Sequence, residues 1–489
     1  MRDDELRQAL LAANPWWQTV STGVDPTAWA NDHPLLLDRA RYDLGYRADV
    51  LADLGVGPIR DALMILTGPR RVGKSVALLE LARTLCGRAD IDPRQVIHLP
   101  CDELDSHDLR RALKLGRDLT RGVDRDGPRR RVWLLDEITG IRGWTATLKF
   151  ARDNSPFGSE TVVVSGSRWN SDEDVEGNLL AGRAGSAGLR RVRLLLPMSF
   201  RAFIAATRPE LARIGPIHPA QLQSSDSRAL VESAIFSVDD YDLSWQEYLS
   251  CGGFPRAVAE QYRQGVVSSD YARDLATWLR RAVDPDAKTE SLPRLLAALT
   301  QRASSPLNVR ATAEELGYSR APFDLRLNRL VSGFGALWCV QRDDHGAPTP
   351  GSQAKLYLTD PLLAWLPSLL HSGLPAPDMT VLSEMAIGMA LARSIDTLEE
   401  GRLVAGDTIG YCRTGNGGEV DFAPVPVPTR AAPQQTVPIE SKWVDRGWRS
   451  EAKTIEGKYG SGIVATKSIL DLDQPSWAVP APLVALLLC

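Results

Sequence analysis

Residues 62–82 read ALMILTGPRRVGKSVALLELA, an apolar run followed by a glycine-rich turn and an amphipathic stretch. The turn matches the spacing G-x-x-x-x-G-K-[ST] of a phosphate-binding loop. In such a loop backbone N–H groups and a helix start surround the phosphates, the lysine reaches their outer oxygens and the serine binds Mg²⁺. The alternative is a chance glycine turn, but the strand before and the helix after are the required context. The sequence therefore predicts an ATP site formed by Gly68, Pro69, Arg70, Arg71, Val72, Gly73, Lys74 and Ser75.

The other half of such a site is a buried strand that ends in a carboxylate, and RRRVWLLDEITG (129–140) supplies it. We expect Asp136 to hold the Mg²⁺ shell with Ser75, and Glu137 to polarise the attacking water. If the loop were a false match, Asp136 would be a helix cap after a core strand. A third apolar run, ETVVVSGSRWN (160–170), ends in Ser165 and Ser167, candidates for contact with the γ-phosphate. Strands alternating with helices predict a parallel α/β sheet with the ligand at the strands' carboxyl ends.

Four arginines follow in the stretch AGRAGSAGLRRVRLLLPMSFRAF (181–203), namely Arg183, Arg190, Arg191 and Arg193. One of them is a candidate arginine finger, which stabilises charge on a neighbouring subunit's nucleotide. We place Arg183 among the nucleotide-binding residues. For each arginine taken singly, a solvated charge at a strand edge is the alternative. A finger acting between subunits would make the protein a homo-oligomer.

Composition limits the classes of protein that fit. A chain of 489 residues is too long for one core, since domains hold roughly 100–200 residues. The net charge of −4 means that a nucleic acid would be held by local basic patches. The six cysteines and six histidines form no C-x-x-C or H-E-x-x-H pattern, so neither a zinc site nor a disulfide framework is indicated. The acidic start MRDDELRQAL and the lack of a long apolar run predict a cytoplasmic protein without a membrane segment.

Residues 291–363 have the pattern of a winged helix-turn-helix: two helices around a turn at GYS, then two apolar strands. The second helix carries polar side chains that could face phosphates or a major groove: Arg320, Arg326, Asn328 and Arg329. We expect the leucines of the same helix, Leu325, Leu327 and Leu330, to face a core. Winged helices also dock proteins, so DNA and protein partners are both open. The apolar tail PLVALLLC is too short to span a membrane and is expected to be a buried strand.

The C-terminal region contains GGEVDFAPVPV (417–427) and TVPIESKWV (436–444), two expected strands behind a helix at 380–395. Alternation with period two puts Glu440 and Lys442 on one face of their strand. Asp421 and Glu440 could bind Mg²⁺ at a scissile phosphate while Lys442 orients water, with Glu419 as a reserve ligand. The alternative is a set of ordinary charges on exposed strands. Lysine is scarce in this chain, with nine residues, and two of these, Lys74 and Lys442, stand where a motif requires lysine.

Taken in order, these motifs resemble a family of bacterial and archaeal predicted AAA+-type ATPases with a C-terminal domain similar to PD-(D/E)xK nucleases. The resemblance runs almost end to end, through NPWW (14–17), LTGPRRVGKS (66–75), WLLDEI (133–138), SGSR (165–168), LLLPMSFRAF (194–203), YLSCGGFPRAV (248–258), KLYLTDPLL (355–363) and GEVDF…PIESK (418–442). Two positions depart from the nuclease pattern: Val420 stands in place of proline, and Ser441 in place of an apolar residue.

The resemblance implies a helical lid over the nucleotide with Arg256 as a second sensor, and Glu384 as an outer metal-binding carboxylate. It implies five segments: an N-terminal helical segment (1–60), an AAA+ core (61–205), a lid (206–287), a winged helix (288–370) and a nuclease-like domain (376–489). The expected cofactors are ATP and Mg²⁺, with Mn²⁺ as a substitute at the nuclease-like site. Two functions fit: an ATP-regulated DNA-processing nuclease, or a nucleotide-dependent switch or scaffold that binds DNA or protein without cleaving it.

Overall fold

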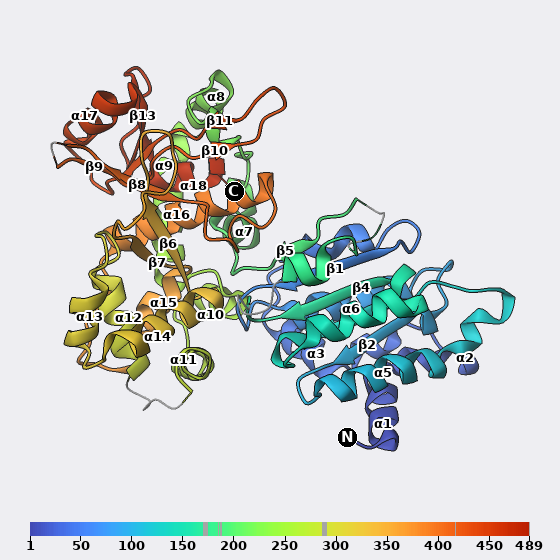
Figure 1. Cartoon of the computed structure of the whole chain (residues 1–489). Helices are drawn as coiled ribbons and strands as arrows, with labels where there is room; N and C mark the ends of the chain where they lie inside the picture. The colour runs from blue at the N-terminus through green and yellow to red at the C-terminus, as the bar shows by residue number, and fades with distance from the viewer. Residues whose placement is uncertain (170–174, 184, 186–187, 286–290, 416, 489) are drawn as a thin grey trace. The chain divides into compact units, whose positions relative to one another are not determined.

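The computed structural model describes residues 1–169, 175–183, 185, 188–285, 291–415 and 417–488 (Figure 1). The chain divides into two compact units. Unit 1 comprises Met1–Asp43 and Arg47–Leu196, and unit 2 comprises Leu44–Tyr46 and Pro197–Cys489. The predicted phosphate loop lies in unit 1, and the predicted nuclease-like motif lies in unit 2.

Unit 1 is built on a parallel five-stranded sheet, as predicted. Its strands are β1 (Ala62–Thr67), β2 (Val96–Pro100), β3 (Val132–Asp136), β4 (Thr161–Gly166) and β5 (Val192–Leu194), in the spatial order β2-β3-β4-β1-β5. The strands are apolar along nearly their whole length because helices cover both faces of a parallel sheet. β4 lies between β1 and β3, so the ends of three strands with predicted site residues are neighbours.

The helices of unit 1 cover both faces of this sheet. α4 (Lys74–Cys86) connects β1 to β2, whereas α5 (Ser106–Leu119) and α6 (Trp144–Asn154) connect strands that advance in the opposite direction. Right-handed crossovers therefore put α4 on one face and α5 with α6 on the other. α5 and α6 contact each other (Figure 1). α4 contacts β2, β3 and β4.

The first part of the N-terminal segment, residues 3–17, covers the open edge of the sheet at β2. The whole segment includes α1 (Asp3–Ala13), the turn Pro15–Trp17, α2 (Thr19–Thr22) and α3 (Pro34–Arg41). The Asn14 amide donates to the carbonyl of His98 at 2.8 Å and accepts from its N–H at 2.7 Å. The indole N–H groups of Trp16 and Trp17 both donate to the carbonyl of Val96 at 2.9 Å. The motif NPWW thus satisfies backbone groups of an edge strand that would otherwise be open to pairing.

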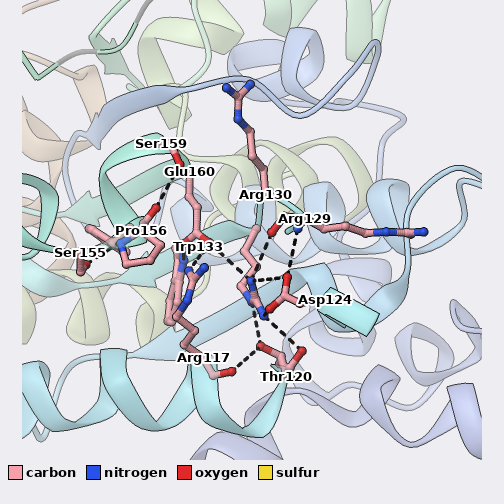
Figure 2. Close-up of polar contacts among 12 residues, drawn as sticks. Arg117, Thr120, Asp124, Arg129, Arg130, Trp133, Ser155, Pro156, Ser159 and Glu160 are labelled. Atoms are coloured by element: carbon pink, nitrogen blue, oxygen red, sulfur yellow. Dashed lines mark hydrogen bonds and ion pairs between the residues drawn. The ribbon is translucent and has the colours of Figure 1, made fainter. Parts of the chain in front are cut away.

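A buried ionic network joins the amino ends of β3 and β4. These strand ends lie at the opposite end of the sheet from the phosphate loop. Glu160 accepts from the indole N–H of Trp133 at 2.7 Å and pairs with Arg117 and, at 3.6 Å, with Arg131. Arg131 is fully buried and also pairs with Asp124 at 2.8 Å. Figure 2 shows Glu160, Trp133 and Arg117 turned toward one another. Because these charges are paired and hydrogen-bonded, the network can be buried without a lone charge.

Unit 2 combines helices with two larger sheets and one two-stranded sheet. Its helices are α7 (Phe200–Thr207), α8 (Ser225–Ser233), α9 (Val238–Cys251), α10 (Pro255–Gln264), α11 (Ser269–Val283), α12 (Ser291–Gln301), α13 (Val309–Glu315), α14 (Arg320–Ser332), α15 (Pro361–Leu370), α16 (Met379–Leu398), α17 (Trp448–Tyr459) and α18 (Ala481–Leu488). The first sheet has the order β7-β6-β8-β9, from β6 (Ala336–Gln341), β7 (Lys355–Leu358), β8 (Gly410–Arg413) and β9 (Glu419–Val420). The second is parallel, from β12 (Ile439–Ser441), β13 (Gly462–Thr466) and β14 (Ser476–Pro480). A two-residue pair, β10 (Pro426–Val427) with β11 (Gln434–Gln435), completes the strands.

The two larger sheets of unit 2 meet next to the predicted nuclease-like residues. Phe422 and Ile439 form an antiparallel bridge with backbone hydrogen bonds of 2.9 and 3.0 Å. β6 and β7 belong to the predicted winged-helix segment, yet β6 pairs with β8 of the predicted nuclease-like segment. Segments 288–370 and 376–489 therefore contribute strands to one sheet.

The second helix of the predicted helix-turn-helix, α14, differs from expectation in one leucine. Leu327 and Leu330 are buried, but Leu325 is 48% exposed. The buried positions of this helix are Phe323, Leu327 and Leu330, which share one face at helical spacing. Leu325 is two residues from Phe323, so a period of 3.6 residues turns it to the opposite face.

The C-terminal tail is a helix and not the expected strand. Residues Ala481–Leu488 form α18, and all eight side chains are buried. Alanine and leucine are strong helix formers, and Val484 is the only β-branched residue in the helix. The side chain of Arg201 donates to the carbonyl of Leu486, and the N–H of Ile217 donates to the carbonyl of Leu487 at 2.7 Å. These bonds satisfy carbonyls that a helix end leaves without partners.

Candidate functional sites

The loop between β1 and α4 has the backbone that its glycines require. Gly68 has φ +147°, and a Cβ there would lie 1.9 Å from the carbonyl oxygen of Leu195. Gly73 has φ +101° at the start of α4. Arg71 takes a left-handed conformation with φ 69°, which is unusual for a residue with a side chain. The loop is thus folded tightly against Leu195, which directly follows β5, and leads into the helix N-terminus, where backbone N–H groups can receive phosphate oxygens.

Lys74 is buried within this loop. Its ammonium donates to the carbonyls of Gly68 and Pro69, each at 2.8 Å. Burial lowers the pKa of Lys74 to about 8, although Glu137 and Asp136 oppose the shift. A cation with so little solvent around it is suited to attract an anion such as a phosphate.

The carboxyl ends of β3 and β4 bring the predicted acidic and serine residues together. Ser165 donates its hydroxyl to Asp136 and accepts the backbone N–H of Glu137 at 2.9 Å. Ser165 and Asp136 are both buried. The Asp136 carboxylate and the Ser75 hydroxyl are oxygen donors of the kind that Mg²⁺ takes in nucleotide sites, so these residues fit the expected ion.

Glu137 is held by side chains from two other elements. Its backbone is left-handed, with φ 55°. Ser167 donates its hydroxyl to the Glu137 carboxylate, and Arg70 of the phosphate loop lies 3.4 Å from the same oxygen. Arg70 also donates to the Ser167 hydroxyl at 3.2 Å. The sequence predicted each of these residues for the nucleotide site but not the contacts among them.

The candidate arginines differ in their surroundings. Arg193 is buried and pairs with Asp53, and Arg183 pairs with Asp153 at 2.6 Å. Arg190 is half-buried, and Arg191 is exposed. Arg256 lies in unit 2, pairs with Glu260 at 2.9 Å and covers the ring of Tyr271. Arg193 is therefore engaged within its own chain, whereas Arg191 is the most exposed of the four arginines in the stretch 181–203.

In unit 2, Asp421, Glu440 and Lys442 lie together where the two sheets meet. The Glu440 carboxylate accepts the backbone N–H of Asp421 at 3.1 Å, and the Asp421 carboxylate accepts the N–H of Ser441 at 3.0 Å. The Lys442 ammonium is 2.9 Å from Glu440 and 3.7 Å from Asp421. The chain thus brings the predicted trio into mutual contact. Ser441 is buried, and its hydroxyl lacks a hydrogen-bond partner.

A lysine that the sequence did not single out lies among the carboxylates. Lys355 of β7 is fully buried. Its ammonium is 2.8 Å from Asp421, 2.8 Å from Glu419 and 3.1 Å from Glu384 of α16. The hydroxyl of Tyr357, on the same strand face, donates to Glu384 at 2.6 Å. Two signals could have found it: Lys355 is one of only nine lysines, and it opens the motif KLYLTDPLL.

Burial and charge set the protonation of these carboxyl groups. Burial raises the pKa of Glu440 to about 8, and the negative charge of Asp421 adds to the shift while Lys442 opposes it. Burial also raises the pKa of Glu384, with Asp421 again adding to it. For Asp421, burial acts in the same direction, but Lys355 and Lys442 outweigh it and lower the pKa. Asp421 is therefore the carboxylate most firmly held in its charged form.

The carboxylates of this cluster do not fit a divalent cation as they stand. The oxygens of Asp421, Glu419 and Glu384 are already directed at the ammonium of Lys355. Within the described part of the chain, the one group of three possible ligand residues with ligand atoms within 4.8 Å of one another is Asp105, His107 and Asp108. In that group Asp105 and His107 are exposed and Asp108 is buried. It is accounted for by the cap of α5, where the Asp105 carboxylate accepts two backbone N–H groups at 2.8 Å.

Two further motifs of unit 2 contact each other through Asp360, which follows β7. The Asp360 carboxylate accepts the N–H of Gly253 at 2.7 Å and that of Leu362 at 2.9 Å. Gly252 has φ +70°, and a Cβ there would lie 2.0 Å from an Asp360 oxygen. The glycine pair of YLSCGGFPRAV is thus required where that loop meets the start of α15.

Comparison with known proteins assigns a family to residues 60–204. Residues 60–204 match a family described as an AAA domain, so this part of the chain is an AAA-type ATPase domain that binds nucleotide. The similar solved structures include a Walker-type ATPase of Pyrococcus abyssi, with 13% identity and a TM-score of 0.35, covering 62% of this chain and 90% of that one. The Thermotoga maritima RuvB Holliday junction branch migration motor has 13% identity and a TM-score of 0.26, covering 65% and 90%. The Aeropyrum pernix ORC1 protein in complex with DNA has 14% identity and a TM-score of 0.26, covering 72% and 91%.

No curated protein matches the chain. Among the described residues, no helix combines the length and the apolar composition needed to cross a membrane.

Proposed function

We propose that this protein is a nucleotide-dependent switch: the AAA domain binds and hydrolyses Mg-ATP, and unit 2 binds a partner, DNA in our proposal, without cleaving it. The observation that carries the ATPase part is the convergence of the Lys74 loop, Asp136, Glu137 and Ser165 at one edge of a parallel sheet. Phosphoryl transfer to water needs little beyond positioning and charge stabilisation, and these residues are of the right kinds to supply both.

In the proposed reaction each group of unit 1 has a separate task. The loop N–H groups and Lys74 bind the β- and γ-phosphates, while Ser75 and Asp136 would hold Mg²⁺, which neutralises charge on the phosphoryl oxygens when bound. Glu137 accepts a proton from the attacking water. Ser167 and Arg70 orient its carboxylate, and Ser165 fixes Asp136. Arg183 would contact the nucleotide only after leaving Asp153.

For unit 2 we favour binding without cleavage over the nuclease. Cleavage needs a divalent cation at Asp421, Glu440 and Glu384. Instead, the ammonium of Lys355 lies 2.8 Å from Asp421 and 3.1 Å from Glu384. Lys442 pairs with Glu440 at 2.9 Å, which leaves that lysine engaged as well. The residue types and their proximity still match those of a nuclease. The plasmid assay described below would detect cleavage if it occurs.

DNA is the partner that the helix-turn-helix pattern favours. α13 and α14 pack together and are followed by the antiparallel pair β6 and β7. On α14, Arg320 and Asn328 are exposed, and Arg320 makes an exposed ion pair with Asp324 at 3.3 Å. Arg326 is less exposed and pairs with Asp284, and Arg329 donates to the carbonyl of Val283. Arg320 and Asn328 are therefore the side chains we assign to DNA. An oligomer is the proposed assembly, because an accessible Arg191 suits a finger shared between subunits.

The test combines ATP turnover with cutting of supercoiled plasmid, in Mg²⁺ or Mn²⁺, with and without ATP. We expect wild type to hydrolyse ATP, Lys74→Ala to lose nucleotide binding, and Glu137→Gln to bind ATP without turning it over. We expect the plasmid to stay uncut but to be retarded in a gel, with Arg320→Ala weakening the retardation and lowering its salt dependence. Cutting by wild type that Lys442→Ala or Glu440→Gln abolishes would replace the switch by the nuclease.

A further inference from the structure

The cluster around Lys355 contains groups that the ATPase chemistry does not use. Four carboxylates, those of Glu384, Glu419, Asp421 and Glu440, come from α16, β9 and its continuation, and β12. Lys355 enters from β7 and reaches three of them, while Lys442 reaches Glu440. Arg413 pairs with the second oxygen of Glu419 at 3.0 Å. The carboxylates are thus supplied with cations from within the chain.

We propose that the ammonium of Lys355 is the resident cation of this cluster and takes the place of a divalent metal. This inference rests on the proposed function, in which unit 2 does not cleave. The ammonium contacts oxygens from three carboxylates at 2.8–3.1 Å. A magnesium ion would need the same oxygens at roughly 2.0–2.1 Å, so the two cations exclude each other.

The sheet that contains Lys355 holds this residue in position. Its backbone is in β7, in register with Cys339 of β6, and β6 pairs in turn with β8. The side chain is fully buried, and its ring neighbour Tyr411 lies 5.6 Å from the ammonium. Moving the ammonium out of the cluster would leave the buried carboxylates of Asp421 and Glu384 without their counter-charge, which the protein interior disfavours strongly.

The lysine also explains why the cluster can be buried without a metal. Asp421 and Glu384 are at most 6% exposed, and charged carboxylates at this depth need a counter-charge. Lys355 supplies it while tying β7 to α16 and β9, elements that are far apart in sequence. These ion pairs connect the motif KLYLTDPLL to the motif GEVDF…PIESK within unit 2.

The experiment counts Mn²⁺ bound to the full-length protein, from the free-ion signal in electron paramagnetic resonance, without nucleotide. Wild type and Asp421→Asn should bind equal numbers of Mn²⁺ ions, because neither has a site at the cluster. Lys355→Met removes the ammonium with little loss of volume, and it should gain one Mn²⁺ site. The double variant Lys355→Met/Asp421→Asn should lose that site again. Lys355→Arg, which keeps the charge, should resemble wild type.

A Mn²⁺ ion bound by wild type and absent from both Asp421→Asn and Glu440→Gln would overturn the proposal. So would a folded Lys355→Met protein that gains no ion. If Lys355→Met does not fold, the comparison of wild type with Asp421→Asn and Glu440→Gln still decides, since only a metal at the cluster makes them differ. ATP turnover is read separately and depends on unit 1, so a failure of the ATPase and a failure of this inference give different results.

Discussion

At the scale of single residues, the conformation of Glu137 depends on its neighbours. A left-handed backbone with φ 55° is costly for glutamate, and it persists where the surroundings hold it. The Ser165 hydroxyl accepts its N–H, and the Ser167 hydroxyl donates to its carboxylate. A proposed general base is thus aimed by two serines of β4 and the segment that follows.

Ser167→Ala should therefore slow ATP hydrolysis without weakening nucleotide binding. Loss of a general base costs roughly 10²–10⁴ in rate, and loss of one orienting hydrogen bond should cost about tenfold in kcat. KM should stay unchanged, because Ser167 acts through Glu137. Steady-state kinetics of Ser167→Ala measures kcat and KM separately. The control is Ser159→Ala, a substitution of an exposed serine. Equal turnover in both variants would show that Ser167 does not position Glu137.

The buried ionic network around Glu160 predicts that a substitution there will lower the stability of the protein strongly. Glu160→Gln leaves Arg131, which is fully buried, with one charged partner fewer. Breaking a buried ion pair on one side costs about 3–5 kcal/mol in the free energy of unfolding. Arg129→Ala, an exposed change in the same segment, should stay within about 0.5 kcal/mol. Urea denaturation of both variants tests this, and a small effect of Glu160→Gln would mean that the network is dispensable.

The residues differ in how far the sequence could predict them. Lys74, Asp136 and Glu137 follow from local spacing, because a loop, a helix start and a strand end are each encoded within a few positions. Lys355 does not, because its contact with Asp421 joins positions 66 residues apart. Nothing local to β7 shows which carboxylates its lysine will meet. The assigned roles of Asp421, Glu440 and Lys442 stay predictions.

At the scale of elements, the N-terminus of α15 carries a pH dependence. Asp360 caps this helix and is fully buried, and burial raises the pKa of Asp360 from 3.8 to about 6. A folded pKa above the unfolded one means that the group's contribution to stability is complete below about pH 4 and is lost as pH rises through 6. The shift corresponds to at most about 3 kcal/mol.

We therefore expect the stability difference between wild type and Asp360→Ser to depend on pH. Serine can still accept the N–H of Leu362 as a helix cap but does not titrate. Between pH 4 and pH 7, wild type should lose up to about 3 kcal/mol relative to Asp360→Ser. Denaturation of both proteins at several pH values gives this difference, in which titrations common to both cancel. A constant difference would contradict the raised pKa.

Two elements show where sequence patterns mislead. The tail PLVALLLC has no polar residue, so hydrophobicity alone does not distinguish a buried strand from a buried helix. Its leucine and alanine content favours the helix that forms. In α14 the leucines were all expected to face a core, but helical period puts Leu325 opposite Phe323. Composition predicts burial of a segment, while period decides which of its side chains are buried.

At the scale of the whole molecule, local patterns predict the order of elements better than their pairing. The parallel sheet of unit 1 follows from strands alternating with helices. In unit 2, by contrast, Val340 of β6 pairs with Gly410 of β8 across a long stretch of chain. The expected winged helix (288–370) and nuclease-like domain (376–489) put a boundary between residues 370 and 376. The strands on either side of it nevertheless share a sheet.

The proposed assembly yields the last prediction. If Arg191 completes the nucleotide site of a neighbouring subunit, Arg191→Ala should bind ATP but turn it over slowly, since arginine fingers contribute roughly 10³–10⁵ in rate. Glu137→Gln should also be slow, for lack of the base. A mixture can place an intact Arg191 from a Glu137→Gln subunit beside an intact Glu137 in an Arg191→Ala subunit.

Turnover measured at constant total protein should therefore rise when the two variants are mixed and reach its maximum near equal amounts. The control replaces the Glu137→Gln partner by the double variant Glu137→Gln/Arg191→Ala, which offers neither group and should give no rise. Sedimentation with Mg-ATP shows whether mixed oligomers form. If they form and turnover stays at the level of the separate variants, Arg191 is not shared between subunits. The same mixtures with Arg183→Ala or Arg190→Ala in its place then identify the finger, because only the correct arginine allows the two defects to complement each other.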